Sequence, residues 1–193
     1  MDLVLAVPGL ILLAIPLIIV AAVVRLNMGS PVLFRQVRPG LHARPFTLLK
    51  FRTMIEGSGE EPNCADDAQR LTRLGRFLRR TSLDELPEVL NVVAGDMSLV
   101  GPRPLLMRYL DRYTEEQMRR HHARPGVTGW AQVNGRNSVG WDERFRLDLW
   151  YVDNWSLALD LKVLWMTIVR VVRRRDIAAP GHATMPEFRG SKQ

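Results

Sequence analysis

The hydrophobic and polar positions divide the chain into one long apolar segment followed by shorter amphipathic ones. Residues 3–24 include no charged side chain, and only Pro8, Gly9 and Pro16 interrupt the apolar run. As a straight helix this segment would extend over about 33 Å, which is enough to cross the hydrocarbon core of a bilayer. The pattern therefore predicts a membrane-associated helix at the start of the chain.

The topology of this helix has more than one solution. A signal peptide is disfavoured because no basic region precedes the run and no small-residue cleavage site follows it. Pro16 lacks a backbone N–H and predicts a kink near the middle of the segment. The arginines that come next, Arg25, Arg35 and Arg38, place its downstream side in the cytoplasm by the positive-inside rule. Hydropathy leaves open a straight span and a helix that breaks at Pro16, dips into one leaflet and returns.

The rest of the pattern predicts a mainly α-helical fold with a small β component. Period-two alternation predicts short strands over 31–38 and 45–54, and an acidic loop follows at 56–67. Helical spacing predicts helices over 67–80, 83–93, 105–122, 142–155 and 156–175. Loops that contain Gly and Pro or Asn separate several of them, at 101–104, 124–129 and 134–137.

The last predicted helix has a broad apolar face and a basic end. The apolar residues are Leu157, Leu161, Leu164, Trp165, Ile168 and Val172. Their uninterrupted stretch is too short to cross a bilayer. Two alternatives remain open, a helix that lies in the membrane interface and a core helix with a basic cap.

Composition narrows the range of partners. The formal net charge is +7, and all but three of the 27 basic residues are arginines, which favours phosphates, lipid headgroups or nucleic acid. Nucleic acid is disfavoured because aromatic residues are few and no recognised binding motif occurs. The single cysteine, Cys64, excludes an internal disulfide and a multi-cysteine metal cluster.

The adjacent carboxylates Asp84 and Glu85 are the main candidates for chemistry. They lie at the predicted start of a helix, where free N–H groups and the helix dipole stabilise negative charge. Ser82 and Glu85 have the spacing of a capping box, so spacing alone favours an architectural role for Glu85. Capping leaves Asp84 without a task, and an ionised aspartate can act as a nucleophile or as a ligand of a hard cation.

Basic residues around this pair suit phosphoryl transfer, in which cations must neutralise the oxygens of the attacked phosphate. Two of them, Arg103 and Arg136, lie in rigid Gly- and Pro- or Asn-containing turns. The full set of candidate phosphate or nucleotide ligands is Lys50, Arg52, Arg79, Arg103 and Arg136.

Several motifs occur in the same order as in a known family. They cover 34–36, 50–54, 74–79, 82–88 (SLDELPE), 90–92, 95–104 (GDMSLVGPRP), 124–137 (RPGVTGWAQVNGRN) and 151–160. Over residues 2–175 the chain resembles the bacterial sugar transferases, also called monotopic phosphoglycosyl transferases. These enzymes transfer a sugar 1-phosphate from a UDP-sugar to a polyprenyl phosphate, usually undecaprenyl phosphate, and release UMP.

The resemblance implies roles for individual residues. Asp84 matches the nucleophile that forms a covalent phosphosugar intermediate, and Glu85 supports it through Mg²⁺ or proton handling. Both carboxylates are then candidate Mg²⁺ ligands. Phosphate- and nucleotide-contacting positions of the family match Lys50, Arg79, Arg103 and Arg136, and a further active-site acid matches Asp160.

The resemblance also implies an architecture and a location. Residues 1–26 would form a re-entrant membrane helix broken at Pro16, 27–176 an α/β catalytic domain with interfacial amphipathic helices, and 177–193 a tail. The family break is often Ser-Pro, whereas Ile15 precedes Pro16 here. The catalytic domain would lie on the cytoplasmic face of the bacterial inner membrane. There it would start a glycan that downstream glycosyltransferases extend.

Two other functions compete with this hypothesis. A membrane-anchored module that binds anionic lipid or phosphate without catalysis explains the arginines and the apolar start, but leaves the Asp84–Glu85 pair unexplained. A glycosyltransferase that moves a bare sugar would release UDP, whereas a phosphoglycosyl transferase releases UMP.

Overall fold

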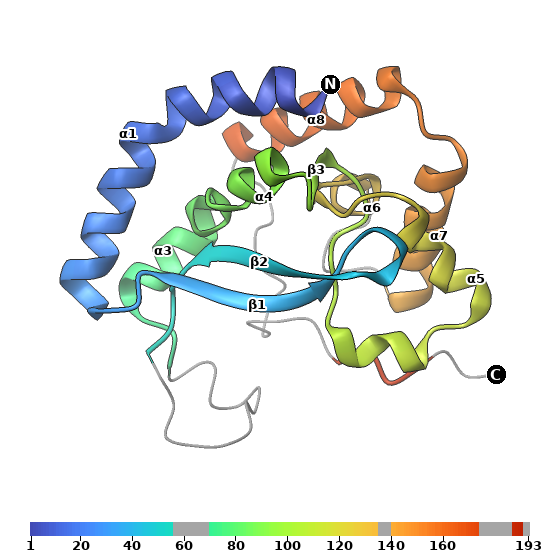
Figure 1. The fold of residues 1–193 in the computed structure, drawn as a ribbon, viewed down its shortest axis with the longest axis horizontal. Helices are drawn as coiled ribbons and strands as arrows, with labels where there is room; N and C mark the ends of the chain where they lie inside the picture. Colours follow the sequence, from blue (N-terminus) through green and yellow to red (C-terminus); the bar gives the residue numbers. More distant parts are fainter. Residues whose placement is uncertain (56–69, 135–139, 174–186, 191–193) are drawn as a thin grey trace.

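The computed structural model describes residues 1–55, 70–134, 140–173 and 187–190. It is mostly helical with a small sheet component, as the sequence predicts (Figure 1). The elements in chain order are α1 (Asp2–Met28), β1 (Leu33–Pro39), η1 (Leu41–Ala43), β2 (Pro45–Phe51), α3 (Arg73–Thr81), η2 (Leu83–Glu85), α4 (Glu88–Ala94), β3 (Ser98–Val100), η3 (Met107–Arg112), α5 (Glu115–Met118), η4 (Arg119–His122), β4 (Gly126–Thr128), α6 (Trp130–Asn134), α7 (Trp141–Asp153) and α8 (Leu157–Arg173).

Two small sheets organise these helices. β1 and β2 form the expected antiparallel hairpin, in a register that runs from Leu33 opposite Phe51 to Pro39 opposite Pro45. The sequence did not predict the second sheet, in which β3 and β4 pair in parallel, because three-residue strands are too short to show an alternation. Glycine is needed beside this sheet, since a Cβ on Gly126 would lie 2.1 Å from the backbone nitrogen of Gly101.

α1 is attached to the rest of the molecule at both ends. At its start, the backbone N–H of Leu99 donates to the Asp2 carboxylate at 3.3 Å. At its end, the Arg52 guanidinium donates to the carbonyls of Gly29 and Ser30, each at 3.0 Å, and to that of Met28. A basic side chain commonly satisfies the last carbonyls of a helix in this way. Both termini of α1 are therefore held by the same domain.

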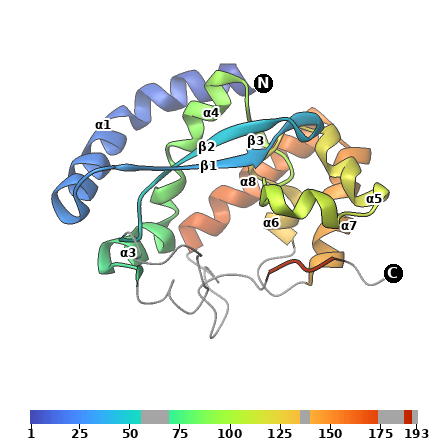
Figure 2. The same ribbon diagram turned by 60° about the horizontal axis from the view of Figure 1, so that its bottom comes forward.

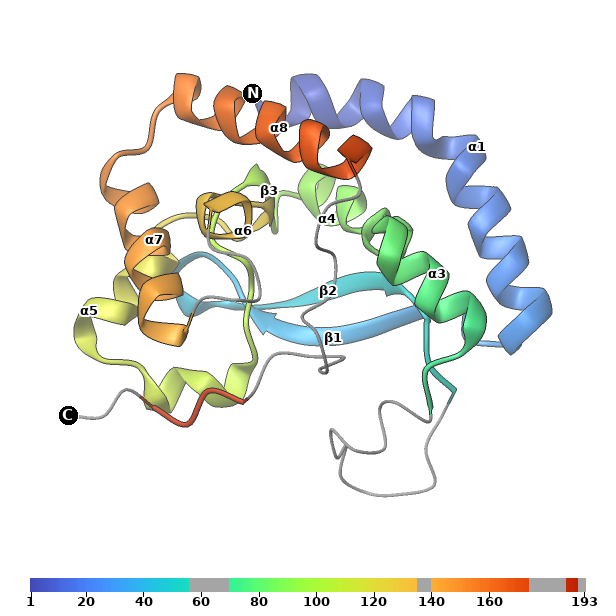
Figure 3. The same cartoon turned by 180° about the vertical axis from the view of Figure 1, so that it is seen from behind.

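The middle of α1 is bent and apolar on its outer side. The helix changes direction about half-way along its length (Figures 1 and 3), which agrees with a proline in the middle of its sequence, at Pro16. By length and composition it is the one helix, within the described ranges, that could cross a membrane. Its most exposed apolar side chains are Val4, Ile11, Leu12, Ile15, Ile18 and Leu26.

α8 is more than a core helix with a basic cap. Leu159 and Val163 are buried in a cluster with Val100, Val133 and Tyr151. A second apolar stripe on the same helix is exposed to the exterior, formed by Leu157, Leu161, Trp165 and Ile168. α8 and the first half of α1 both lie along the upper edge of the molecule in Figures 1 and 3.

Two predicted helices differ from the observed ones. The continuous helix predicted over 105–122 is wrong: the chain forms η3, α5 and η4, with Tyr113 extended and Thr114 opening α5 through a capping box with Gln117. The helix predicted over 67–80 is interrupted: Arg70 is helical, but Leu71 forms an isolated bridge with Met54. α3 then begins at Arg73, where the Thr72 hydroxyl accepts the N–H of Gly75 and caps it. Residues 67–69 are outside the described part of the chain.

The short segment 187–190, which the sequence assigned to the tail, packs near η3 and α7 (Figure 2). Phe188 is only 2% exposed and contacts four aromatic rings, those of Tyr109, Tyr113, Trp141 and Phe145. Its backbone N–H donates to the Tyr109 hydroxyl at 3.3 Å, and its carbonyl accepts from Arg112. The segment therefore closes an aromatic core between η3 and α7.

Removing this ring should destabilise the fold moderately. We expect Phe188→Ala to lower the free energy of unfolding by about 2–3 kcal/mol, below the ~3–5 kcal/mol usual for a core phenylalanine. The reduction arises because a terminal segment can detach locally without global unfolding. Denaturant unfolding followed by tryptophan fluorescence measures the change. Phe77→Ala, at a 56% exposed position, is the control, and an equal effect of both variants would contradict the packing seen here.

Candidate active site

The Asp84–Glu85 pair lies on a tight connection between two helices. α3 ends at Ser82, whose backbone adopts the left-handed conformation (φ 56°). One turn of 3-10 helix, η2, then carries both carboxylates, and Pro87 follows as the N-cap residue of α4. Asp84 is 9% exposed. The reversal of the chain at Ser82 thus turns both acids toward β2 and the loop after β3.

The capping-box role predicted for Glu85 is wrong. Ser82 makes no side-chain cap hydrogen bond to η2, because its left-handed backbone ends α3 instead. The Glu85 carboxylate is occupied elsewhere: it accepts from the Lys50 ammonium at 2.6 Å and from the Arg103 guanidinium. Glu85 therefore organises two of the predicted phosphate-binding cations.

The two carboxylates have opposite electrostatic environments. Burial alone would raise the pKa of Glu85, but the adjacent Arg103 and Lys50 outweigh it and hold that pKa well below its usual range. Burial raises the pKa of Asp84, and the negative charge of Glu85 adds to the rise. The cations Lys50, Arg79 and Arg103 act on Asp84 in the opposite direction. Glu85 is thus a permanent anion, whereas Asp84 is the more basic and more nucleophilic of the two.

Glu88 is a third acid of this site that the sequence analysis assigned only to a helix. It is 2% exposed, and its carboxylate lies 3.0 Å from the Lys50 ammonium. Burial raises its pKa to about 7, an effect that Lys50 partly offsets and Glu85 reinforces. In the sequence, its position within the 82–88 motif could have marked Glu88 as a residue of the site. Lys50 is therefore held between two carboxylates that differ in proton affinity.

The raised pKa of Glu88 predicts a pH-dependent stability. The folded state binds this proton more tightly than the unfolded chain, so the stabilisation is complete below pH 4.5 and is lost as the pH rises through about 7. We expect Glu88→Gln to remove this pH dependence. The free energy of unfolding of the variant, relative to that of wild type, should therefore rise by up to about 3 kcal/mol between pH 4.5 and pH 8. Chemical denaturation at both pH values measures it. An identical pH dependence of the two proteins would contradict the assignment.

Arg79 and Arg103 are each held in place by a hydrogen bond to a residue outside the carboxylate pair. The Arg79 Nε donates to the Thr53 hydroxyl at 3.1 Å, just beyond β2. Arg103 lies in the Gly-Pro-Arg-Pro loop after β3, and its carbonyl accepts from Arg120 at 2.8 Å. Arg120 is itself buried in an ion pair with Asp148, at 2.7 Å. The loop that carries Arg103 is thereby tied to α7.

Two other predicted site residues, Arg52 and Asp160, lie away from the carboxylate pair. Arg52 holds the carbonyls at the end of α1, as described above. Asp160, at the start of α8, accepts from the Tyr151 hydroxyl at 2.7 Å and from the Trp155 indole at 3.1 Å. Burial raises its pKa, and its charged neighbours are Asp2 and the N-terminal amine. Arg136 falls outside the described residues.

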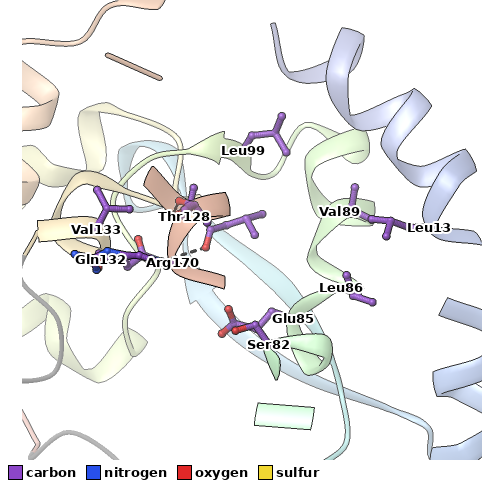
Figure 4. Close-up of a pocket in the computed structure, with 12 residues that line it drawn as sticks. Leu13, Ser82, Glu85, Leu86, Val89, Leu99, Thr128, Gln132, Val133 and Arg170 are labelled. Carbon is purple, nitrogen blue, oxygen red and sulfur yellow. Dashed lines mark hydrogen bonds between the residues drawn. The ribbon is translucent and has the colours of Figure 1, made fainter. Parts of the chain in front are cut away.

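A cavity of about 360 Å³ adjoins the pair (Figure 4). Most of its wall is aliphatic, from Leu13, Leu86, Val89, Leu99, Val127 and Val133. At one side Glu85 and Ser82 line it, and across from them lie Gln132 and Arg170. The cavity therefore extends from Leu13 of α1 to Glu85.

The metal-binding capacity of the site depends on few protein groups. Across the described ranges, no cluster of three or more His, Cys, Asp or Glu side chains could hold an ion by itself. Asp84 and Glu85 supply two adjacent carboxylates, which suits Mg²⁺, since this ion commonly takes one or two carboxylates and completes its shell with water and substrate phosphates.

Comparison with known proteins identifies the family. The sequence model described as bacterial sugar transferase matches residues 1–174, nearly the whole chain. The chain belongs to the bacterial sugar transferase family. The match includes α1, both sheets and every described residue of the site above.

Among similar members of the family is a protein of Bacillus subtilis (strain 168) named uncharacterized sugar transferase EpsL. It is 58% identical over 170 residues, which cover 88% of this chain and 84% of that one. The UDP-glucose:undecaprenyl-phosphate glucose-1-phosphate transferase of Escherichia coli (strain K12) is 40% identical over 179 residues, and the undecaprenyl-phosphate galactose phosphotransferase of Salmonella typhimurium is 42% identical over 165. This chain spans only 39% and 34% of those two longer proteins.

Proposed function

We propose that this chain transfers a sugar 1-phosphate from a UDP-sugar to undecaprenyl phosphate, or a similar polyprenyl phosphate, and releases UMP. The observation that carries the proposal is the Asp84–Glu85 pair, placed among the cations Lys50, Arg79 and Arg103. Of the relatives with 40–42% identity, one is named for the transfer of glucose 1-phosphate between UDP-glucose and undecaprenyl phosphate, and another is named an undecaprenyl-phosphate galactose phosphotransferase. Membership of the family and the charge pattern of the site support the same chemistry.

In the first step, a carboxylate oxygen of Asp84 attacks the phosphorus that bears the sugar. The bond from that phosphorus to the bridging oxygen breaks, and UMP leaves with the electron pair. In the second step, a phosphate oxygen of the lipid attacks the same phosphorus and restores the Asp84 carboxylate. Charge on the phosphate oxygens is stabilised by Lys50, Arg79 and Arg103, which are held in position before substrate arrives.

Glu85 has a supporting role in this scheme. Its ion pairs fix the ammonium of Lys50 and the guanidinium of Arg103, and both cations act on the charge of Asp84. With Asp84 it also forms the pair that would hold Mg²⁺ together with the donor diphosphate. Such an ion would supply charge neutralisation for the departing UMP.

We also propose that α1 enters and leaves the same leaflet, as a re-entrant helix bent at Pro16. Hydrogen bonds from Leu99 to Asp2 and from Arg52 to the last carbonyls attach both ends of α1 to one domain. A spanning helix would carry its two ends to opposite faces of the bilayer. The exposed apolar stripe of α8 would lie in the interface beside it. The catalytic domain would then face the cytoplasm of a bacterial inner membrane, where UDP-sugars and later glycosyltransferases are found.

The released nucleotide tests the function directly. Purified protein is incubated with Mg²⁺, undecaprenyl phosphate and a panel of UDP-sugars that includes UDP-glucose and UDP-galactose. We expect UMP with at least one donor. Release of UDP instead would indicate transfer of a bare sugar, and no turnover with any donor would favour a binding module without catalysis.

A further inference from the structure

The cavity beside Glu85 is lined mainly by apolar side chains, which do not suit the UDP-sugar donor. Six aliphatic side chains form most of its wall: five come from α1, α4, α6 and the β3–β4 sheet, and Leu86 comes from the connection between η2 and α4. A sugar and a uridine diphosphate would leave many hydroxyl and phosphate groups without partners against such a surface, at a high desolvation cost. The cations suited to the donor, Lys50, Arg79 and Arg103, are absent from the described residues that line the cavity.

One side of the cavity is nevertheless polar. Arg170 of α8 lines it and donates to the carbonyl of Gln132 at 2.9 Å. Thr128 and Thr167, which hydrogen-bond to each other at 2.8 Å, lie on the same side. The labelled side chains of Arg170 and Gln132 lie across the space from Leu86 and Val89 (Figure 4). An occupant should therefore be amphipathic, with one anionic group and an aliphatic body.

Leu13 connects this space to the apolar exterior of α1. The side chain of Leu13 lines the cavity wall next to Val89. Its neighbour Leu12 is 79% exposed on the outer side of the same helix, and Ile15 is 70% exposed. An aliphatic chain that leaves the cavity past Leu13 would therefore continue along a hydrophobic surface.

From this geometry we infer that the cavity is the site of the acceptor lipid, with its phosphate held by Arg170 and its first isoprene units packed between Leu13, Val89 and Leu99. The inference rests on the proposed function and deepens it by assigning the acceptor a site separate from that of the donor. A volume of about 360 Å³ accommodates the phosphate and the first isoprene units only, so the remaining chain lies along α1. The acceptor phosphate then faces Glu85, the neighbour of the nucleophile.

Photocrosslinking tests occupancy without any turnover. The full-length protein in lipid nanodiscs is irradiated with a polyprenyl phosphate that carries a diazirine in its second isoprene unit, and labelled peptides are mapped. We expect labelling of α4 or β3, near Val89 or Leu99, that excess undecaprenyl phosphate removes. Competition of equal strength by phosphatidic acid or inorganic phosphate would indicate a general lipid or anion site. Labelling confined to the exposed side of α1, at Leu12 or Ile15, would overturn the inference.

A cavity-filling variant tests the separation of donor and acceptor. Leu99→Trp should reduce lipid-linked product formation at low acceptor concentration about tenfold or more, equivalent to ~1.4 kcal/mol of acceptor affinity. Exchange of labelled UMP into the UDP-sugar, which needs no acceptor, should stay within about twofold of wild type. Leu90→Trp, at the 38% exposed side of α4, is the matched control. An equal loss of exchange and transfer in Leu99→Trp would assign the cavity to the donor and overturn the inference.

Arg170→Gln gives an independent measurement at the polar end. It should raise the acceptor KM and leave UMP exchange unchanged, whereas Arg146→Gln, on the exposed side of α7, should change neither. An unaltered acceptor KM in Arg170→Gln contradicts the inference. If wild type releases no UMP with any donor, the proposed reaction fails, yet crosslinking at Val89 or Leu99 would still establish the lipid site.

Discussion

Asp84→Asn should reduce UMP release and lipid-linked product by at least about 10³-fold, because the neutral amide lacks the negative charge that makes the carboxylate oxygen nucleophilic. The same variant should take up no label from a donor labelled in its sugar-bearing phosphate, whereas wild type becomes labelled in the absence of acceptor. Radiometric analysis of the isolated protein measures both. If Asp84→Asn still acquired label, another residue would be the nucleophile.

This loss can be separated from unfolding. Because burial raises the pKa of Asp84, its ionised form costs folding energy that a neutral amide does not. Asp84→Asn should therefore match or exceed wild type in thermal stability at neutral pH. Asp153→Asn changes a carboxylate that is 46% exposed and is the control for the general effect of removing a charge.

The buried pair between Arg120 and Asp148 should have the largest effect on stability. Arg120→Met would leave the Asp148 carboxylate, whose side chain is only 3% exposed, without its partner. We expect a loss of about 3–5 kcal/mol in the free energy of unfolding. The loop of Arg103 should also loosen, because its carbonyl loses the hydrogen bond from Arg120, so the remaining folded enzyme should have a lower kcat.

The neighbouring residue supplies a matched control. Arg119 forms an ion pair with Asp153 in which both side chains are more than 40% exposed. Arg119→Met should therefore cost less than about 1 kcal/mol. The double variant Arg120→Met, Asp148→Leu should recover much of the stability, since no buried charge remains. Urea unfolding of wild type, the two single variants and the double variant measures these differences. Similar losses of stability in Arg119→Met and Arg120→Met would contradict the role of burial.

The local patterns predicted the elements whose length exceeds a few residues. The β1–β2 hairpin and α4, α7 and α8 lie close to their expected positions, because period-two and helical spacing report which face of an element is buried. The β3–β4 sheet and the breaks within 105–122 were not predictable in this way. A three-residue strand has too few positions to show a period, and the pairing of β3 with β4 requires the close approach of Gly101 and Gly126, which are distant in the sequence.

In the site, too, some features could be predicted from the sequence and others depended on tertiary packing. The order of the motifs predicted one set of site residues, and the fold brings five of them together: Asp84, Glu85, Lys50, Arg79 and Arg103. Asp160, from the same predicted set, instead lies with Tyr151 and Trp155, and Arg136 is outside the described residues. Spacing favoured a capping role for Glu85, which the left-handed backbone of Ser82 prevents. In the sequence, Glu88 is distinguished only by its position within the 82–88 motif. Its raised pKa depends on burial, which is a property of packing.

The sequence by itself determined the apolar first helix, the hairpin and the pair of adjacent carboxylates, because each is encoded by neighbouring residues. Only the tertiary structure decided which cation each carboxylate receives, since Lys50 and Arg103 are separated from Glu85 by 35 and 18 residues. It also decided that both ends of α1 meet one domain and that an aliphatic cavity joins α1 to Glu85. Contacts between distant segments depend on how whole elements pack, which no local pattern records.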